Sequence, residues 1–93
     1  MVTKTVRFKA VLKNKLGLHA RPASLFVESA KKFKSNILIK KDNQLANAKS
    51  ILEVLSLGVE MGDEIEVICE GEDAEQASQA LKNLIEKLPS LEE

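Results

Sequence analysis

Residues 64–70 read EIEVICE, and residues 71–89 continue GEDAEQASQALKNLIEKLP. In the first segment apolar side chains recur at every second position, which predicts a strand with one buried face. These side chains are Ile65, Val67 and Cys69. In the second segment the apolar spacing becomes that of an amphipathic helix. Its stripe consists of Ala74, Ala77, Leu81, Leu84, Ile85 and Leu88.

The ends of this helix carry recognisable signals. Asp73, together with Gln76, is expected to cap the start, and Pro89 is expected to stop the helix. Cys69 lies on the inward side of the preceding strand, so we expect a buried, unreactive thiol. A strand that leads directly into such a helix predicts helices packed against a sheet.

The N-terminal part of the chain repeats this order. Alternation from Val6 to Leu12 predicts a strand, and the pattern breaks at residues 14–17. A helical spacing follows, carried by Ala23, Phe26, Val27, Ala30 and Phe33. Pro22 is compatible with the first turn of this helix, where its missing N–H costs nothing.

The middle of the chain predicts two short strands and a short helix. Residues 36–40 are rich in β-branched side chains and predict a strand, and residues 44–47 predict a brief return strand. The turn at Asp42 and Asn43 makes this pair antiparallel. Residues 50–53 read SILE and match a capping box, so a helix should begin after Ser50 and end near residue 58.

The predicted element order is βαββαβα, which indicates a two-layer α+β sandwich. The chain of 93 residues is long enough for one core and too short for two, so we expect a single domain over residues 1–93. The composition is 44% hydrophobic and 30% charged, as in globular proteins. No apolar run is long enough to span a membrane, and the first residues lack a signal-peptide core, so a cytoplasmic location is expected.

The counts of cysteine and histidine limit the chemistry. One cysteine cannot form an intrachain disulfide, and with a single histidine no Cys/His metal site and no cofactor are expected. Residues 1–49 hold 12 Lys and Arg against 2 Asp and Glu, whereas residues 50–93 hold 2 against 12. Two interpretations stay open: a basic face that attracts acidic partners, or charges that intermix in the fold and cancel locally.

The most informative segment is GLHARPA at residues 17–23, where the first strand gives way to the first helix. His19 falls at or beside the N-cap, where Ser, Thr, Asp or Asn is the ordinary choice. The unpaired N–H groups and the dipole at a helix start favour an anion and a neutral imidazole. A neutral imidazole nitrogen is a nucleophile, and a phosphoryl group placed on it would lie against the amides of Ala20 and Arg21. The Arg21 guanidinium could add charge-assisted hydrogen bonds.

An isolated histidine is more often a surface loop residue. The residues by themselves therefore indicate an anion site, with phosphoryl transfer as one of its uses. No general base or substrate pocket accompanies His19, so a partner would have to complete the chemistry.

Two segments of the sequence resemble HPr, the phosphocarrier family of the bacterial phosphoenolpyruvate-dependent sugar phosphotransferase system. Residues 17–23 resemble its active-site motif, and NAKSIL at residues 47–52 with LSLGV at residues 55–59 resembles its regulatory-serine segment. The resemblance implies an open-faced β-sandwich, with a four-stranded antiparallel sheet and three helices on one face. It also implies a carrier that is not itself an enzyme and that needs partner enzymes.

The resemblance further implies that Nδ1 of His19 receives a phosphoryl group from phospho-enzyme I and passes it to a sugar-specific enzyme IIA, with Arg21 assisting. Leu16 departs from the family, which commonly has a small polar residue near the active site at this position. A side-chain hydrogen bond to the phosphohistidine from that position is therefore lost.

The resemblance implies a second modification site and a docking surface. In some bacteria an HPr kinase/phosphorylase would modify Ser50, with a catabolite-control transcription factor as a further partner, whereas in others the serine is present without that kinase. A phosphoserine adds about −1.5 to −2 charges at pH 7. Ile51, Leu52 and Leu55 lie within two turns of a short helix; we expect some to face the core and the others to form an apolar docking patch with Lys49 and Arg21.

Two other classes of function remain open. One is a regulatory relative that binds a transcription factor or metabolic enzyme without phosphate on histidine; the presence of His19 argues against it. The other is a nucleic-acid-binding domain that uses the basic half, which the zero net charge and the absence of Tyr and Trp disfavour. Neither nucleic acid nor a membrane is therefore expected as a partner, and a monomer is expected for a carrier.

Overall fold

The structure is a computed structural model that describes residues 3–92. The strands are β1 (Thr5–Val11), β2 (Asn36–Lys41), β3 (Gln44–Asn47) and β4 (Glu64–Glu70). The helices are α1 (Ala20–Ala30), α2 (Ile51–Ser56) and α3 (Ala74–Leu91). The predicted element order is confirmed, with β2 extending one residue beyond the predicted end.

The four strands form one antiparallel sheet in the order β1-β4-β2-β3. In the register of the sheet, Val67 on β4 lies between Phe8 on β1 and Ile39 on β2. Val67 and Ile39 are fully buried. This row of apolar side chains runs across the middle of the sheet and forms the floor of the core.

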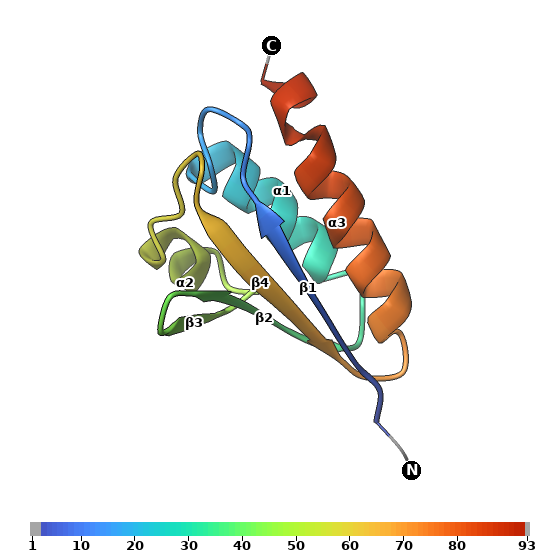
Figure 1. Ribbon diagram of the computed structural model, residues 1–93. Helices are drawn as coiled ribbons and strands as arrows, with labels where there is room; N and C mark the ends of the chain where they lie inside the picture. The colour runs from blue at the N-terminus through green and yellow to red at the C-terminus, as the bar shows by residue number, and fades with distance from the viewer. Residues whose placement is uncertain (1–2, 93) are drawn as a thin grey trace.

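The helices cover one face of the sheet, as the resemblance implies (Figure 1). α3 packs on β1 and β4, and α1 packs between α2 and α3. Phe26 from α1 and Leu81 from α3 are fully buried over the strands. No helix within residues 3–92 is both long and apolar enough to cross a membrane.

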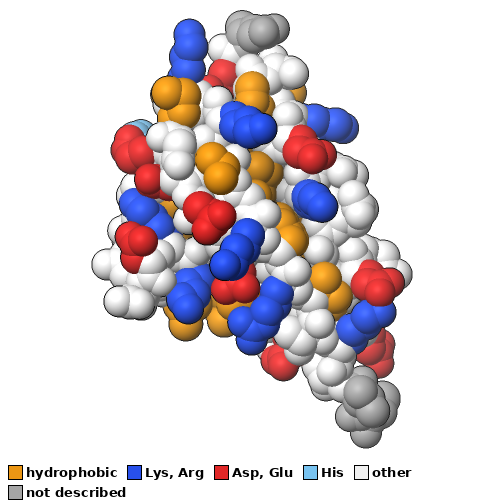
Figure 2. All heavy atoms as spheres, in the orientation of Figure 1, with side chains coloured by type: hydrophobic (Ala, Val, Ile, Leu, Met, Phe, Trp, Pro, Cys, Tyr) orange, Lys and Arg blue, Asp and Glu red, His pale blue; other side chains and the backbone are white. Residues whose placement is uncertain are grey.

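The other face of the sheet is left open and carries charges of both signs. Figure 2 shows basic and acidic side chains interspersed over it, with apolar side chains between them. In the register, Glu66 on β4 lies between Lys9 on β1 and Lys40 on β2. Basic strands from the first half of the chain thus flank an acidic strand from the second half. On this face the charges intermix, and no uniformly basic surface forms.

Both ends of α3 differ from the prediction. Pro89 lies inside the helix, which continues to Leu91. Proline removes one N–H but keeps a helical φ, so it weakens the last turn without ending it.

The start of α3 differs because Asp73 occupies the N-cap but makes no side-chain cap. Its carboxylate instead accepts hydrogen bonds from the amides of Lys34 and Ser35 and from the Ser35 hydroxyl. These donors hold the pKa of Asp73 below its usual value, with the Ser35 hydroxyl as the main cause. Asp73 therefore ties the start of α3 to the turn before β2.

The predicted capping box at α2 is half formed. Ser50 Oγ accepts a hydrogen bond from the amide of Glu53 at 3.3 Å, as expected. The Glu53 carboxylate accepts from the amide of Asn47, because the Ser50 amide already donates to the Asn47 carbonyl. The reciprocal half of the box is therefore absent.

Cys69 is fully buried, as predicted from its place on β4. Burial raises the pKa of its thiol to about 11, with a smaller contribution from the Asp73 charge. The reactive thiolate is therefore scarce at neutral pH.

Candidate functional site

His19 lies at the N-cap of α1, as predicted. Its backbone is extended (φ −81°, ψ −170°), and its side chain makes no cap hydrogen bond. About half of the side-chain surface is exposed, 51%. The ring is therefore accessible to a partner at the edge of the molecule, where Figure 2 shows the histidine side chain in pale blue.

The start of α1 leaves two amides available. The His19 amide donates to the Leu16 carbonyl at 3.0 Å, and the Ala23 amide donates to the His19 carbonyl at 2.8 Å. Pro22 has no N–H, so the remaining first-turn donors are the amides of Ala20 and Arg21. Within residues 3–92 neither of these two amides has an acceptor. They are unpaired donors at the positive end of a helix dipole, an arrangement that binds anions.

The loop before α1 is fixed against the segment that follows α2. Gly17 has φ +54°, and a Cβ at this position would lie 2.3 Å from the Val59 carbonyl oxygen. The Leu18 amide donates to the same carbonyl at 3.0 Å. On the other side, Asn14 Nδ2 donates to the Gly17 carbonyl at 2.8 Å. Only glycine permits this close approach with a positive φ.

Glu60 is the residue at this site that the sequence analysis missed. His19 Nε2 lies 2.7 Å from Glu60 Oε1. The two residues are 41 positions apart, and no spacing in the sequence connects them. Glu60 directly follows the segment of residues 55–59 that carries the family resemblance, and this adjacency was the one available signal.

Arg21 and Leu16 lie beside the histidine loop. Arg21 makes no ion pair within the described part of the chain. Together with Leu25 and Leu91, both line a hollow between the start of α1 and the end of α3. Leu16 is 46% exposed, so it presents an apolar side chain beside the histidine loop.

The predicted docking residues on α2 are all exposed. Ile51 is 38% exposed, Leu52 75% and Leu55 39%. The expectation that some of them face the core is wrong, because Val54 and Leu57 make the core contacts of this segment. A helix of six residues has room for a single inward stripe, and Val54 occupies it.

The structure does not bring Lys49 or Ser50 next to His19. The Lys49 ammonium donates to the Phe33 carbonyl at 2.7 Å, beyond the C-terminal end of α1. His19 lies at the other end of this 11-residue helix, which spans roughly 16 Å. Ser50 follows Lys49 directly and is half-buried. The candidate modification sites therefore occupy opposite ends of α1.

Among residues 3–92, no group of three or more His, Cys, Asp or Glu side chains could hold a metal ion. The groups at His19 are instead an imidazole ring, two unpaired amides and the Glu60 carboxylate, and Arg21 follows two residues along the chain. These groups can accept an anion and hold it beside the ring nitrogen.

Comparison with known proteins places this fold and site in a family. Residues 6–87 match the family model PTS-HPr, described as the PTS HPr component phosphorylation site. The chain therefore belongs to the HPr family, the phosphocarriers of the phosphotransferase system. The resemblance found in the sequence is confirmed at this level.

The relatives include proteins named phosphocarrier and proteins named HPr-like. The chain is 45% identical to the phosphocarrier protein HPr of Mycoplasma capricolum, over 82% of this chain and 85% of the relative. It is 47% identical to the HPr-like protein Crh of Halalkalibacterium halodurans, over 94% and 99% of the two chains. The crystal structure of HPr-C-His from Thermoanaerobacter tengcongensis superposes with a TM-score of 0.89 at 48% identity, covering 91% of this chain and 96% of that one.

Proposed function

We propose that this protein is a cytoplasmic, monomeric phosphocarrier that takes a phosphoryl group from phospho-enzyme I on His19 and delivers it to an enzyme IIA. The observation that carries the proposal is the exposed His19 ring at the N-cap of α1, beside the unpaired amides of Ala20 and Arg21. A ring that served only to cap the helix would hydrogen-bond to those amides.

In the proposed transfer, the lone pair of His19 Nδ1 attacks the phosphorus atom on the donor histidine. A new N–P bond forms as the donor N–P bond breaks, and the bonding electron pair stays on the donor nitrogen. The phosphoryl oxygens then accept hydrogen bonds from the Ala20 and Arg21 amides and from the Arg21 guanidinium. Delivery to enzyme IIA is the same step with the roles exchanged.

The exposed side chains of Ile51, Leu52 and Leu55 support a shared docking patch for enzyme I and enzyme IIA. Arg21 would steer acidic partners toward this patch and speed their encounter. Lys49 lies at the Ser50 end of the surface, so we assign it to contacts made there.

Ser50 is the proposed regulatory site. Phosphorylation by an HPr kinase/phosphorylase would replace the cap bond to Glu53 with a negative charge beside the patch, which would repel acidic partners. The same charge would create a surface for a catabolite-control transcription factor.

Intact mass measurement tests the main proposal. The protein is incubated with phosphoenolpyruvate, magnesium and enzyme I, and one acid-labile phosphoryl group should appear. His19→Ala should gain none, whereas Ser50→Ala should gain it normally. An unmodified wild-type protein under these conditions would contradict the carrier function.

A second candidate is a regulatory role without histidine phosphorylation, supported by the 47% identity to a relative named Crh. A parallel reaction with ATP and HPr kinase separates the two. The regulatory role predicts acid-stable labelling that Ser50→Ala removes, with no labelling of His19 from enzyme I. The carrier role requires labelling of His19 whatever happens at Ser50.

A further inference from the structure

Glu60 is held against the reactive histidine, and neither the family motifs nor the proposed transfer assigns it a role. Its carboxylate oxygen lies 2.7 Å from His19 Nε2. We propose that Glu60 is a positioning residue that keeps His19 Nδ1 free for phosphoryl transfer and offsets the positive charge that the ring gains in that step. This inference rests on the proposed function of His19.

The first part follows from the hydrogen-bonding capacity of the two groups. An ionised carboxylate can only accept, so the nitrogen that faces Glu60 must carry the proton. In the neutral imidazole this leaves the lone pair on Nδ1. The contact therefore selects the ring tautomer with the nucleophile on the nitrogen away from Glu60, and it restricts rotation of the ring.

The second part follows from the charge balance of the step. A neutral ring that forms an N–P bond through Nδ1 becomes an imidazolium, because its proton stays on Nε2. No proton has to move, and positive charge develops next to the Glu60 carboxylate. A carboxylate in this position stabilises a developing imidazolium, as it does beside the catalytic histidine of serine proteases.

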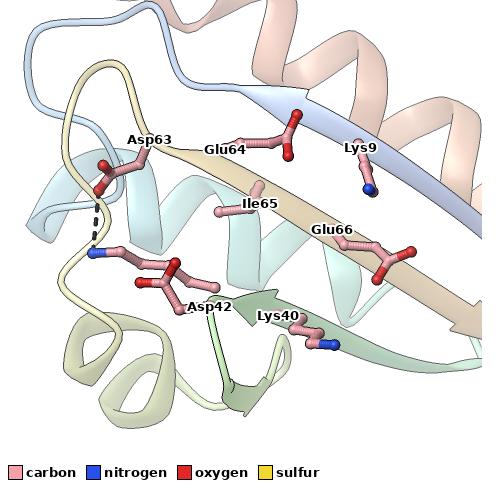
Figure 3. A pocket seen from close by; sticks show the side chains of 8 residues that line it. Lys9, Lys40, Asp42, Asp63, Glu64, Ile65 and Glu66 are labelled. Carbon is pink, nitrogen blue, oxygen red and sulfur yellow. Dashed lines mark ion pairs between the residues drawn. The ribbon is translucent and has the colours of Figure 1, made fainter.

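The backbone around Glu60 is fixed by its own set of contacts. The Glu60 amide donates to Asp63 Oδ2 at 2.7 Å, and the Asp63 amide donates back to the Glu60 carbonyl at 3.0 Å. Lys41 Nζ pairs with Asp63 at 3.1 Å, a contact drawn as a dashed line in Figure 3. The same ammonium donates to the Gly58 carbonyl at 2.9 Å.

These contacts tie residues 58–63 to the end of β2, while Val59 binds the loop before His19. The amide of Glu60 and the ammonium of Lys41 also hold the pKa of Asp63 below its usual value, so the Asp63 carboxylate stays ionised at neutral pH. Glu60 is thus an exposed side chain on a well-anchored backbone, which is the arrangement expected for a residue that must stay in place.

The proposal is tested with Glu60→Gln and Glu60→Ala. The amide oxygen of Gln can accept from Nε2 but carries no charge, whereas Ala removes both effects. Glu66→Gln on the open face of the sheet makes the same charge change away from the site and is the matched control. Glu60 is exposed and Glu66 is half-buried on the open face of the sheet. Amide NMR spectra check that each of the three variants is folded.

The tautomer is read from ¹⁵N NMR of the ring, where the single histidine of the chain gives one pair of nitrogen signals. In the neutral ring of the wild type, Nε2 should be protonated and Nδ1 unprotonated. The shift difference between the two nitrogens should decrease in Glu60→Ala and remain in Glu60→Gln. This measurement needs no partner protein.

Reactivity is measured as the rate of His19 phosphorylation by phosphoramidate, a small phosphoryl donor, and by phospho-enzyme I at saturating protein. The Glu60 variants should react about threefold to fivefold more slowly with both donors, the range expected for an exposed charge pair, and Glu66→Gln should match the wild type. Equal rates for the wild type and Glu60→Gln would overturn the inference. A wild type that reacts with phosphoramidate but not with phospho-enzyme I would refute the carrier function alone.

Discussion

The first turns of α1 and α2 both contain amides that need acceptors, and the two helices differ in how these amides are paired. Both N-cap residues are extended, but Ser50 accepts a hydrogen bond from the amide of Glu53, whereas His19 accepts none from the first turn of α1. The His19 ring turns instead toward Glu60. One helix start is satisfied within the chain, and the other is left with unpaired donors that a ligand can use. The contrast shows that the candidate site is created by omitting a structural interaction.

The largest effect on this contrast is expected from Gly17→Ala. The new Cβ would lie 2.3 Å from the Val59 carbonyl oxygen, and φ is +54°. We expect a loss of about 3 kcal/mol in the free energy of unfolding, with slower phosphorylation of His19. Gly58→Ala is the matched control, because φ there is +63° but no atom lies within 4 Å of the new Cβ. It should lose only about 1 kcal/mol in urea unfolding, the cost of the left-handed backbone alone.

The next effect compares Arg21, which follows His19 at the start of α1, with Lys49, which lies at the Ser50 end of the surface. Arg21→Ala should slow phosphoryl transfer to His19 about tenfold, the equivalent of about 1.4 kcal/mol, because a charged hydrogen bond to the phosphoryl group is lost. Lys49→Ala should leave the rate unchanged, since its ammonium binds the Phe33 carbonyl at the other end of α1. Rapid-quench kinetics measure both rates. An equal slowing by the two variants would contradict the separation of the sites.

Substitutions at the two N-cap residues test the difference between the two helix starts directly. His19→Ser supplies an ordinary N-cap to α1 and should raise the free energy of unfolding by about 1 kcal/mol while it abolishes phosphorylation by enzyme I. Ser50→Ala removes the cap of α2 and should lower the free energy of unfolding by about 1 kcal/mol without affecting His19. Denaturant titrations give both values. A His19→Ser variant less stable than the wild type would show that the α1 start is already satisfied.

The smallest effect is a change in the acid dependence of stability. It involves two carboxylates, one in the segment beside His19 and one at the start of α3. Asp63 accepts a hydrogen bond within residues 58–63, and Asp73 accepts hydrogen bonds that fix the start of α3. The pKa of each is held below its usual value. Folding therefore favours their ionised forms. Their contribution is fully present above the unfolded pKa of about 4 and is lost as pH falls through the lower folded value. Asp63→Asn and Asp73→Asn should each flatten the decrease in stability between pH 6 and pH 3, measured by urea unfolding.

Much of the fold could be predicted because it depends on local patterns. Alternation marks the inward face of β4, and the helical spacing marks α3 and α1 with their buried residues. His19 could be placed at an N-cap because the apolar stripe of α1 begins just after it. The end of α3 could not be placed, because a proline in the last turn removes one N–H but keeps a helical φ, so the helix can continue past it.

The remaining features depend on contacts between distant segments. The side chain of Asp73 finds donors at residues 34 and 35, and the ammonium of Lys49 finds a carbonyl at residue 33. The contact of Glu60 with His19 exists because Gly17 lets residues 58–60 pack against the histidine loop. None of these pairings leaves a periodic signal in the sequence, so tertiary structure was needed to find them.

The pairing of β4 with both β1 and β2 has a consequence for the order in which the molecule assembles. Thr5 pairs with Glu70, and Val11 with Glu64, so the two strands meet only after most of the chain is available. Such distant pairings slow folding, because a long loop must close before the contacts form. During synthesis, the loop before His19 could form its contacts with Val59 only after residues 58–60 have left the ribosome. His19 is thus expected to become able to accept a phosphoryl group late in folding, at nearly the same time as β1 pairs with β4.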